Sequence, residues 1–319
     1  MIGILMTNLG TPEAPTAPAL RKYLAEFLGD PRVVTLPRLL WLPILYGPIL
    51  TFRPKKSAEK YAKIWTTDGS PLKVNTERQA KLVKGLFGLQ RQDLLIAWGM
   101  RYGQPSIASQ LDALISQGAQ RVVVLPLYPQ YAGSTTESTQ DAVTAWRKKN
   151  PNTPVTLISN YHDHPAYIGA LAESVRAHWE KNGRADKLVM SFHGIPQQVV
   201  DQGDPYADQC KHTGKLLAAE LGLNENQWKL TFQSRFGPAK WLQPYTQPTL
   251  ETMGREGVAS VDVICPGFSS DCLETLEEIS MEVREAFLAC GGKQFAYIPC
   301  LNDRPAHIAA LAEILKPSL

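Results

Sequence analysis

One histidine in this sequence follows an apolar segment and precedes a glycine and a proline. The segment 187–192 predicts a buried strand, and Gly194 and Pro196 end it, so His193 lies where the strand stops. In open parallel α/β sheets, ligands bind beyond the carboxyl ends of the strands. A neutral imidazole there could bind a metal or accept a proton, although a histidine can also simply hydrogen-bond within a turn. His193 is therefore a candidate for chemistry, with a structural role as the alternative.

Three glutamates follow a later strand, each four residues after the one before. The segment 265–282 predicts a strand end and then a helix, which puts Glu274, Glu278 and Glu282 on one helix face. Like charges at this spacing cost roughly 0.2–0.5 kcal/mol per pair. An acidic stripe is also typical of a surface helix, and Asp271 with Glu274 matches a capping box. The opposite face is apolar and consists of Leu273, Leu276, Ile279, Val283 and Phe287.

The histidine and the acidic helix together suggest a metal site. Both His193 and the start of this helix are expected at the carboxyl ends of strands of one parallel sheet, and therefore on the same edge of it. An imidazole with a carboxylate suits a divalent metal such as Fe(II), and further carboxylates could pass on metal or accept protons. The sequence thus indicates His193 together with a carboxylate of the row Glu274, Glu278 and Glu282.

Strands and helices alternate along the whole chain. Helical patterns separate the apolar runs, for example at 16–28, 106–116, 165–180, 206–221 and 304–315. This alternation predicts an α/β protein with parallel sheets covered on both faces, four strands to each half. The predicted strands are at 2–8, 94–98, 121–126, 155–159, 187–192, 228–233, 260–265 and 294–298.

The two halves resemble each other in sequence. Pro126 and Pro266 both close third strands, and segments 163–173 and 303–313 match at most positions with the same offset of 140 residues (266 − 126 and 303 − 163). Leu9-Gly10 matches His193-Gly194, and the triplet beginning at Arg101 matches the one beginning at Arg235. A shared register of this kind predicts an internal duplication.

The duplication predicts two similar α/β domains, each with a four-stranded parallel sheet. We expect them at 1–160 and 161–303, with a C-terminal helix at 304–319 that is able to pack back on the first domain. From Gly10 to Arg101 is 91 residues, whereas from Gly194 to Arg235 is 41, so the first half carries about 50 additional residues. We place this insertion at about 30–80, at the strand-end edge where a binding site would need a wall.

The insertion contains an apolar run followed by a basic one. Residues 39–50 are apolar throughout but too short for a membrane span, which needs about 20 residues, and two prolines and a glycine interrupt them. The run is either a loop over a core or an apolar lip with a cationic rim, suited to a hydrophobic anionic ligand or a membrane surface. The lip residues are Leu39, Leu40, Trp41 and Leu42, and the rim residues are Arg53, Lys55, Lys56, Lys60 and Lys63.

Composition excludes several classes of protein. With 44% hydrophobic and 20% charged residues, the chain is globular, and a net charge of +3 does not favour nucleic-acid binding. Five cysteines without a Cys-x-x-Cys pair indicate a reducing compartment. No leader, nucleotide-binding glycine motif or serine nucleophile elbow is evident. Five other histidines lack ligand spacing and are interpreted as structural or exposed: His162, His164, His178, His212 and His307.

Five motifs in this order resemble the ferrochelatase family, whose members insert ferrous iron into a porphyrin. They are LGTP at 9–12, LPLYPQY at 125–131, SFHGIP at 191–196, FQSRFG at 232–237, and CPGF at 265–268 running into DCLETLEE at 271–278. They span essentially the whole chain. The compact form resembles the enzymes of Gram-negative bacteria.

The resemblance implies roles for particular residues. It implies two flavodoxin-like domains with a porphyrin cleft between them. It also implies a metal-facing pair at His193 and Glu274, and a path for metal or protons at Glu278 and Glu282. The segment 39–50 matches the lip that covers the macrocycle and can touch a membrane. Porphyrin-binding positions are expected at Leu9, Arg101, Tyr102, Tyr128, Gln130, Ser234 and Arg235.

The resemblance also implies the partners of the enzyme. Iron and protoporphyrin IX are expected as substrates, in a cytoplasmic monomer that touches the inner membrane at most peripherally. Cys290 and Cys300 alone cannot supply an iron–sulfur cluster, so we expect no cluster and no resident cofactor. Two alternatives stay open: a chelatase that inserts cobalt or nickel into another tetrapyrrole, and a carrier that binds a tetrapyrrole without reacting. The sequence does not distinguish protoporphyrin from coproporphyrin as the substrate.

Overall fold

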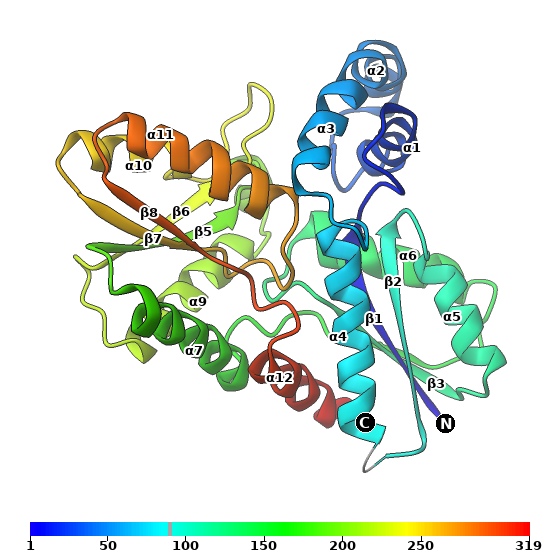
Figure 1. Ribbon diagram of the computed structural model, residues 1–319. Coiled ribbons are helices and arrows are strands. Elements are labelled where there is room, and N and C mark those ends of the chain that lie inside the picture. Colours follow the sequence, from blue (N-terminus) through cyan, green and yellow to red (C-terminus); the bar gives the residue numbers. More distant parts are fainter. Residues whose placement is uncertain (89–90) are drawn as a thin grey trace. The chain divides into compact units, whose positions relative to one another are not determined.

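The computed structural model describes residues 1–88 and 91–319 and divides into two compact units. Unit 1 comprises residues 1–160 and 311–319, and unit 2 comprises residues 161–310. Each unit contains one four-stranded parallel sheet with helices on both faces (Figure 1). The predicted fold class is confirmed.

Unit 1 is built around β1 (Ile2–Gly10), which lies between two other strands of its sheet. The strand order is β2 (Leu94–Tyr102), β1, β3 (Arg121–Pro126) and β4 (Val155–Leu157). Helices α5 (Ile107–Ser116) and α6 (Ser138–Arg147) cover one face through an apolar cluster. On the other face, Asn8 of β1 donates a hydrogen bond to Thr76 of α4 (Pro71–Gly88) over 3.1 Å.

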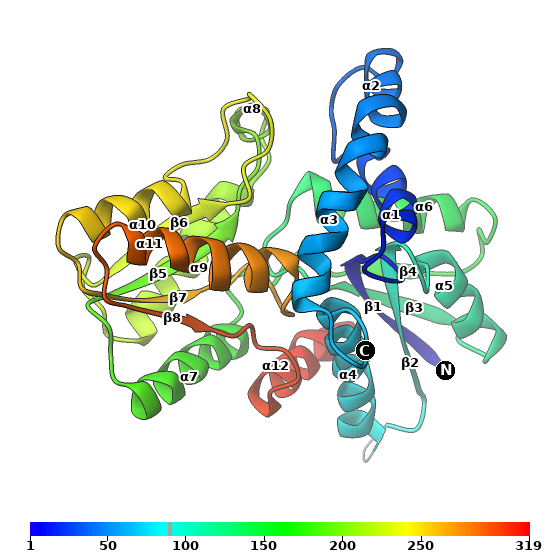
Figure 2. The same cartoon turned by 45° about the horizontal axis from the view of Figure 1, so that its top comes forward.

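The insertion of unit 1 is helical along most of its length. It contains α2 (Arg38–Ile44), the π-helix η1 (Leu45–Ile49), α3 (Leu50–Ile64) and the first part of α4, and α1 (Ala17–Leu28) precedes it. Both views show α2 and α3 extending away from the sheet of this unit (Figure 2). Among the described residues, no helix is both long and apolar enough to span a membrane.

Unit 2 repeats the strand order of unit 1. Its sheet runs β6 (Trp228–Gln233), β5 (Lys187–His193), β7 (Ser260–Ile264) and β8 (Gln294–Ile298). One face packs against α10 (Thr246–Arg255), the π-helix η3 (Glu274–Val283) and α11 (Arg284–Ala289) through an apolar cluster. The remaining helices of this unit are α7 (Pro165–Asn182), α8 (Gln197–Asp201) and α9 (Tyr206–Glu220). Helix α12 (Pro305–Leu315) contributes residues to both units.

The two units contain equivalent backbone hydrogen bonds, one within each unit. The amide of Met100 donates to the Pro105 carbonyl over 2.7 Å, and the amide of Phe232 donates to the Pro244 carbonyl over 2.8 Å. In unit 1, Gly10 pairs with Tyr102, so the preceding Leu9 lies beside Arg101. In unit 2, His193 pairs with Gln233. If Leu9 is equivalent to His193, Arg101 is therefore equivalent to Gln233. The strand register therefore corrects the sequence comparison, which had equated Arg101 with Arg235.

Gly10 ends β1 at a position that no other residue could occupy without strain. Its φ is +121°, and a Cβ atom built on it would lie 1.8 Å from the carbonyl oxygen of Tyr102. At the equivalent Gly194 of unit 2, a Cβ would lie 2.9 Å from the carbonyl oxygen of Gln233. Both first strands therefore end with their backbone pressed against the neighbouring strand.

Candidate active site

His193 is the last residue of β5, a strand with neighbours on both sides of the sheet. Its ring is half-buried, with ring centroids of Trp241 and Phe268 each 6.4 Å away. Its Nδ1 lies 2.6 Å from the carbonyl oxygen of Gly194. Because a carbonyl can only accept a hydrogen bond, Nδ1 is the donor, and the neutral imidazole then has its lone pair on Nε2. The side chain is thus arranged to bind a metal or accept a proton through Nε2.

Glu274 begins the helix that follows β7, but this helix is not the α-helix expected from the sequence. Residues Glu274–Val283 form a π-helix, a form in which each hydrogen bond spans one residue more and which is frequent at functional sites. The residues buried in this π-helix differ from those that an α-helical pattern predicts. Glu277 is 1% exposed, whereas Leu273 and Leu276 of the expected apolar face are only half-buried.

Glu278 is held by a residue in a left-handed backbone conformation. Ser234 has φ of 65° and donates to the two carboxylate oxygens of Glu278, from its amide over 2.7 Å and from its hydroxyl over 2.5 Å. Burial raises the pKa of Glu278, and the negative charge of Glu274 adds to this effect. The two hydrogen bonds and the nearby His193 oppose it without cancelling it. A carboxylate with a raised pKa is a better proton acceptor, so Glu278 is suited to that role.

Gln233 links β5, β6 and the π-helix beneath these groups. It is 3% exposed; its amide nitrogen donates to the Glu274 carbonyl over 2.8 Å, and its amide oxygen accepts from Ser191 over 2.7 Å. Ser191 is also within 2.8 Å of the hydroxyl of Thr246. A fully hydrogen-bonded buried network of this kind rigidifies its surroundings, here the backbone at the start of the π-helix.

The other acidic residues near the helix start have different surroundings. Asp271 is 6% exposed and accepts hydrogen bonds from Thr275, Tyr297 and Asn302 over 3.0, 2.5 and 2.6 Å, so it anchors the loop rather than extending the acidic row. Glu282 is exposed at the far end of the π-helix. Of the predicted secondary carboxylates, Glu278 is therefore the one that lies close enough to influence His193.

In unit 1, Arg101 and Tyr102 converge on a carboxylate that the sequence did not indicate. Asp30 accepts from Arg101 Nη2 over 2.5 Å and from the Tyr102 hydroxyl over 2.8 Å. Ser138 also donates to Asp30 over 2.8 Å and accepts from Arg101 Nε over 2.7 Å. Tyr102 is 1% exposed and Asp30 is 8% exposed. These residues form a buried ionic network, with little of the Tyr102 side chain accessible to a ligand.

The remaining predicted positions differ in accessibility. Leu9 and Tyr128 are half-buried, and Gln130 is buried at 2%. In unit 2, Ser234 is half-buried, while Arg235 is exposed with its guanidinium 5.2 Å from the centre of the Tyr245 ring. Of these residues, Ser234 is the hydrogen-bond partner of Glu278, and Arg235 follows it in the same loop.

The apolar run of the insertion is helical, and its four predicted lip residues do not share one environment. Leu39 and Leu40 are 91% and 64% exposed. Trp41 is buried and its indole nitrogen donates to the Leu28 carbonyl over 2.7 Å, while Leu42 is half-buried. Trp41 therefore anchors the helix, and the leucines before it supply the exposed apolar surface, because successive helix residues point in different directions.

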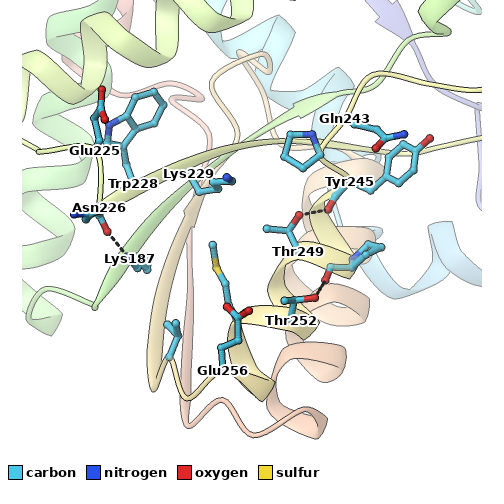
Figure 3. A pocket seen from close by; sticks show the side chains of 14 residues that line it. Lys187, Glu225, Asn226, Trp228, Lys229, Gln243, Tyr245, Thr249, Thr252 and Glu256 are labelled. Atoms are coloured by element: carbon cyan, nitrogen blue, oxygen red, sulfur yellow. Dashed lines mark hydrogen bonds between the residues drawn. The ribbon is translucent and has the colours of Figure 1, made fainter.

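A pocket of about 720 Å³ lies elsewhere in unit 2, along β6 and α10 (Figure 3). Trp228, Lys229, Tyr245 and Thr249 are among its lining residues. None of the predicted catalytic or metal-binding residues lines it. The volume of this pocket therefore does not identify the candidate site, which is defined by the chemistry of His193 and its neighbours.

Comparison with known proteins gives a consistent result. The sequence model of the ferrochelatase family matches residues 1–319. A curated ferrochelatase from Aromatoleum aromaticum is 60% identical over 316 residues, which make up 98% of this chain and 87% of that protein. One from Polaromonas sp. is 59% identical over 311 residues, or 97% of this chain and 85% of that protein.

Solved structures agree on the fold. SirB from Bacillus subtilis, determined with Fe3+, has a TM-score of 0.60 at 10% identity, covering 99% of this chain and 95% of SirB. CbiX, described as the terminal enzyme for biosynthesis of sirohaem in denitrifying bacteria, has a TM-score of 0.52 at 12% identity, covering 99% of each chain. The resemblance found in the motifs is confirmed: this chain belongs to the ferrochelatase family.

Proposed function

We propose that this ferrochelatase inserts Fe(II) into protoporphyrin IX at His193, in the last step of haem formation. The observation that carries the site assignment is the hydrogen bond from Nδ1 of His193 to the Gly194 carbonyl, because it directs the Nε2 lone pair away from the turn. The reaction converts porphyrin and Fe(II) to haem and releases two pyrrole protons. A base beside the ring and a ligand for the arriving metal are both required.

We assign proton acceptance and metal binding to residues of unit 2. His193 accepts a pyrrole proton or ligates iron, and Glu274 at the start of the π-helix is its partner. Glu278, whose pKa is raised by burial, takes protons onward, and the exposed Glu282 ends the path. We propose that the enzyme acts as a monomer.

We propose further residues as porphyrin-binding positions, because the motifs that contain them match those of the family. They are Ser234 and Arg235 of unit 2, and Leu9, Tyr128 and Gln130 of unit 1. Arg101 and Tyr102 would act by keeping the end of β2 rigid through Asp30. In the described part of the chain, the buried Nε1 of the half-buried Trp241 lacks a hydrogen-bond partner, and its ring lies 6.4 Å from that of His193. It therefore offers a donor to a bound ligand.

We propose that the enzyme works without a resident cofactor. The sequence has five cysteines and no Cys-x-x-Cys pair, and only Cys290 and Cys300 lie in its last 30 residues. They are too few to supply the four thiolates that an iron–sulfur cluster needs. Iron is then a substrate only.

The proposed activity is tested by anaerobic incubation of the purified protein with Fe(II) and protoporphyrin IX. We expect free-base porphyrin fluorescence to disappear over many turnovers, and Glu274→Gln to lower the rate by roughly 10²-fold or more, because Gln removes the charge at nearly constant shape. Glu285→Gln, at an exposed glutamate of α11, is the matched control and should retain full activity. Stoichiometric porphyrin binding without insertion would instead indicate a carrier, and faster insertion of Co(II) or Ni(II) into another tetrapyrrole would indicate a different chelatase.

We also propose that the protein is cytoplasmic and touches the membrane surface through the exposed apolar residues of its insertion. Leu39, Leu40 and Phe52 are 91%, 64% and 70% exposed, and the exposed Lys55 and Lys56 follow them. Apolar side chains beside lysines favour anionic bilayers. We expect co-sedimentation with vesicles containing anionic lipid, and a several-fold loss of binding in Leu39→Ser/Leu40→Ser. Leu82→Ser/Leu86→Ser, on exposed positions of α4, is the matched control. Equal binding by both double variants would refute the role of the lip.

A further inference from the structure

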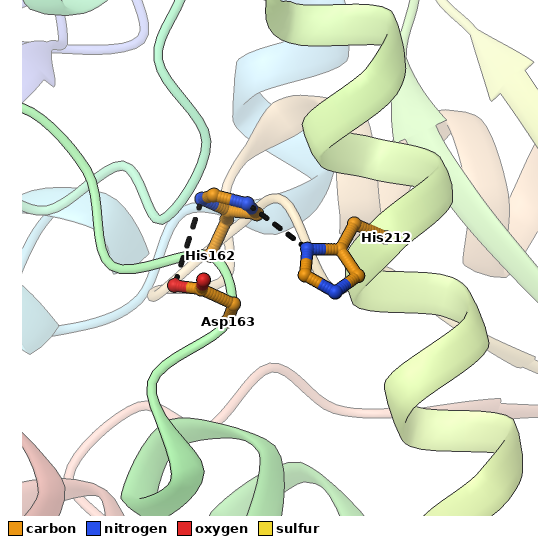
Figure 4. A group of neighbouring side chains, drawn as sticks. All are labelled: His162, Asp163 and His212. Atoms are coloured by element: carbon orange, nitrogen blue, oxygen red, sulfur yellow. Dashed lines mark hydrogen bonds and ion pairs between the residues drawn. The ribbon is translucent and has the colours of Figure 1, made fainter.

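Two histidines that are 50 residues apart in the sequence meet in unit 2. His162 lies in the segment before α7, and His212 lies on α9 (Figure 4). Nε2 of His162 and Nδ1 of His212 are 3.4 Å apart, and Asp163 completes the group. One potential ligand atom from each residue lies within 4.8 Å of the others. The sequence analysis interpreted both histidines as structural or exposed, because their spacing along the chain gave no indication of a pair.

The separation of the two nitrogens fits a shared metal ion. Metal–imidazole bonds of about 2.1 Å in tetrahedral geometry place two ligand nitrogens about 3.4 Å apart (2.1 × 1.63). The observed 3.4 Å matches this separation, and it is also within reach of a hydrogen bond between the two rings. A metal ion would replace the proton of that hydrogen bond.

Asp163 approaches the other nitrogen of the His162 ring. Its carboxylate is 3.9 Å from Nδ1 of His162, while Nε2 of that ring is the nitrogen close to His212. A carboxylate near the distal nitrogen of a metal-binding histidine orients the ring and increases its basicity. Figure 4 shows the two contacts of the His162 ring, one through each nitrogen.

The backbone around the pair is fixed independently of any metal. The hydroxyl of Thr213, next to His212, donates to the His162 carbonyl over 2.8 Å. The neighbouring Tyr161 is buried, with its ring perpendicular to that of Tyr167 at 5.4 Å. The His162 side chain is 13% exposed and His212 is exposed, so an ion could enter from solvent without a change in the fold.

We propose that His162 Nε2 and His212 Nδ1 form a binding site for a divalent transition metal, with Asp163 orienting His162. Two imidazoles with adjacent open positions suit Zn²⁺, Co²⁺ or Ni²⁺, with water completing the coordination. This site shares no residue with the group around His193 and Glu274, and the inference does not depend on the proposed function.

The test uses Zn²⁺ and the complete chain, free of any affinity tag. To silence the candidate active site, titrations are made in a His193→Asn background against a chromogenic zinc chelator. We expect one bound Zn²⁺, a roughly 100-fold weaker affinity after adding His212→Gln, and a roughly tenfold weaker affinity after adding Asp163→Asn. Bound Co²⁺ should show visible absorption that is lost in the His212→Gln protein.

A matched substitution one turn further along α9 separates metal ligation from helix disturbance. Lys215→Gln changes an exposed residue of the same helix and should leave Zn²⁺ affinity unchanged. Because His212 is exposed, its replacement should also leave the metal-free melting temperature unchanged. The inference is overturned if the His193→Asn protein binds no Zn²⁺, if His212→Gln binds it as tightly as the parent, or if Lys215→Gln causes the same loss.

Discussion

Replacing His193 with asparagine is expected to lower the turnover number for iron insertion by roughly 10²–10⁴-fold, with little change in porphyrin affinity. An asparagine amide can still donate to the Gly194 carbonyl, which accepts from Nδ1 of the histidine over 2.6 Å. It has no group at the position of Nε2. The variant therefore preserves the turn and removes only the atom to which we assign the chemistry. Steady-state insertion under anaerobic conditions gives the turnover number, and porphyrin fluorescence titration gives the affinity.

His193→Ala provides the comparison for this experiment. Alanine removes both the contact with Gly194 and the Nε2 lone pair, so equal losses in the two variants would assign the effect to Nε2. If the asparagine protein retains wild-type turnover while the alanine protein does not, His193 only organises the turn, and our assignment of the chemistry is wrong. Melting temperatures within a degree or two of wild type would show that neither change acts through unfolding.

Asp30→Ala is expected to destabilise unit 1 by about 3–5 kcal/mol, because it leaves Arg101 without its carboxylate in a largely buried position. Asp30 accepts hydrogen bonds from Arg101, Tyr102 and Ser138 through one oxygen. Its other oxygen accepts from the Arg32 amide over 2.8 Å. All of these donors would lose their partner at once. Urea unfolding followed by circular dichroism measures the change in the free energy of unfolding.

Asp68→Ala is the control, because it also removes an aspartate from an ion pair with arginine. Asp68 lies 3.0 Å from Arg78, but these side chains are 62% and 49% exposed, so the cost should stay below about 1 kcal/mol. Similar decreases in the free energy of unfolding of the two variants would mean that the Asp30 network stabilises the fold no more than an exposed ion pair does.

The Asp30 network also gives stability a pH dependence. Burial alone would raise the pKa of Asp30, but hydrogen bonds from Arg32, Tyr102 and Ser138 and the charge of Arg101 lower it below 3.8 overall. A carboxyl whose folded-state pKa is depressed stabilises the fold above its unfolded pKa. That contribution is lost as pH falls from about 4 through the folded pKa. The stability difference between wild type and Asp30→Ala should therefore shrink in the same acidic range.

The sequence predicted those features that depend on local pattern. All eight strands were found, with β3, β6 and β8 at their observed boundaries, because buried parallel strands are short apolar runs bounded by turn residues. The strand-end position of His193 followed from the same pattern. The repeated strand order agrees with the duplication inferred from the shared register.

Features that depend on distant contacts were not predicted. Each hydrogen bond of a π-helix spans one residue more than in an α-helix. A helical pattern with 3.6 residues per turn therefore does not predict that Glu277 is buried. Asp30 becomes meaningful only when β2 brings Arg101 against it, across 71 residues of chain. His162 and His212 also come together only in the folded chain, and their separation of 50 residues in the sequence gives no indication of the contact.

Ser138 and Glu278 occupy equivalent positions in the two halves of the chain, at the 140-residue offset (278 − 138). A π-helix begins close to each of them, at Gly133 and at Glu274, although the first has 5 residues and the second 10. Each side chain contacts the end of an outer strand: Ser138 meets Tyr102 over 3.0 Å, and Glu278 meets Ser234 over 2.5 Å. The same contact therefore belongs to a buried ion pair in unit 1 and holds a carboxylate of raised pKa in unit 2.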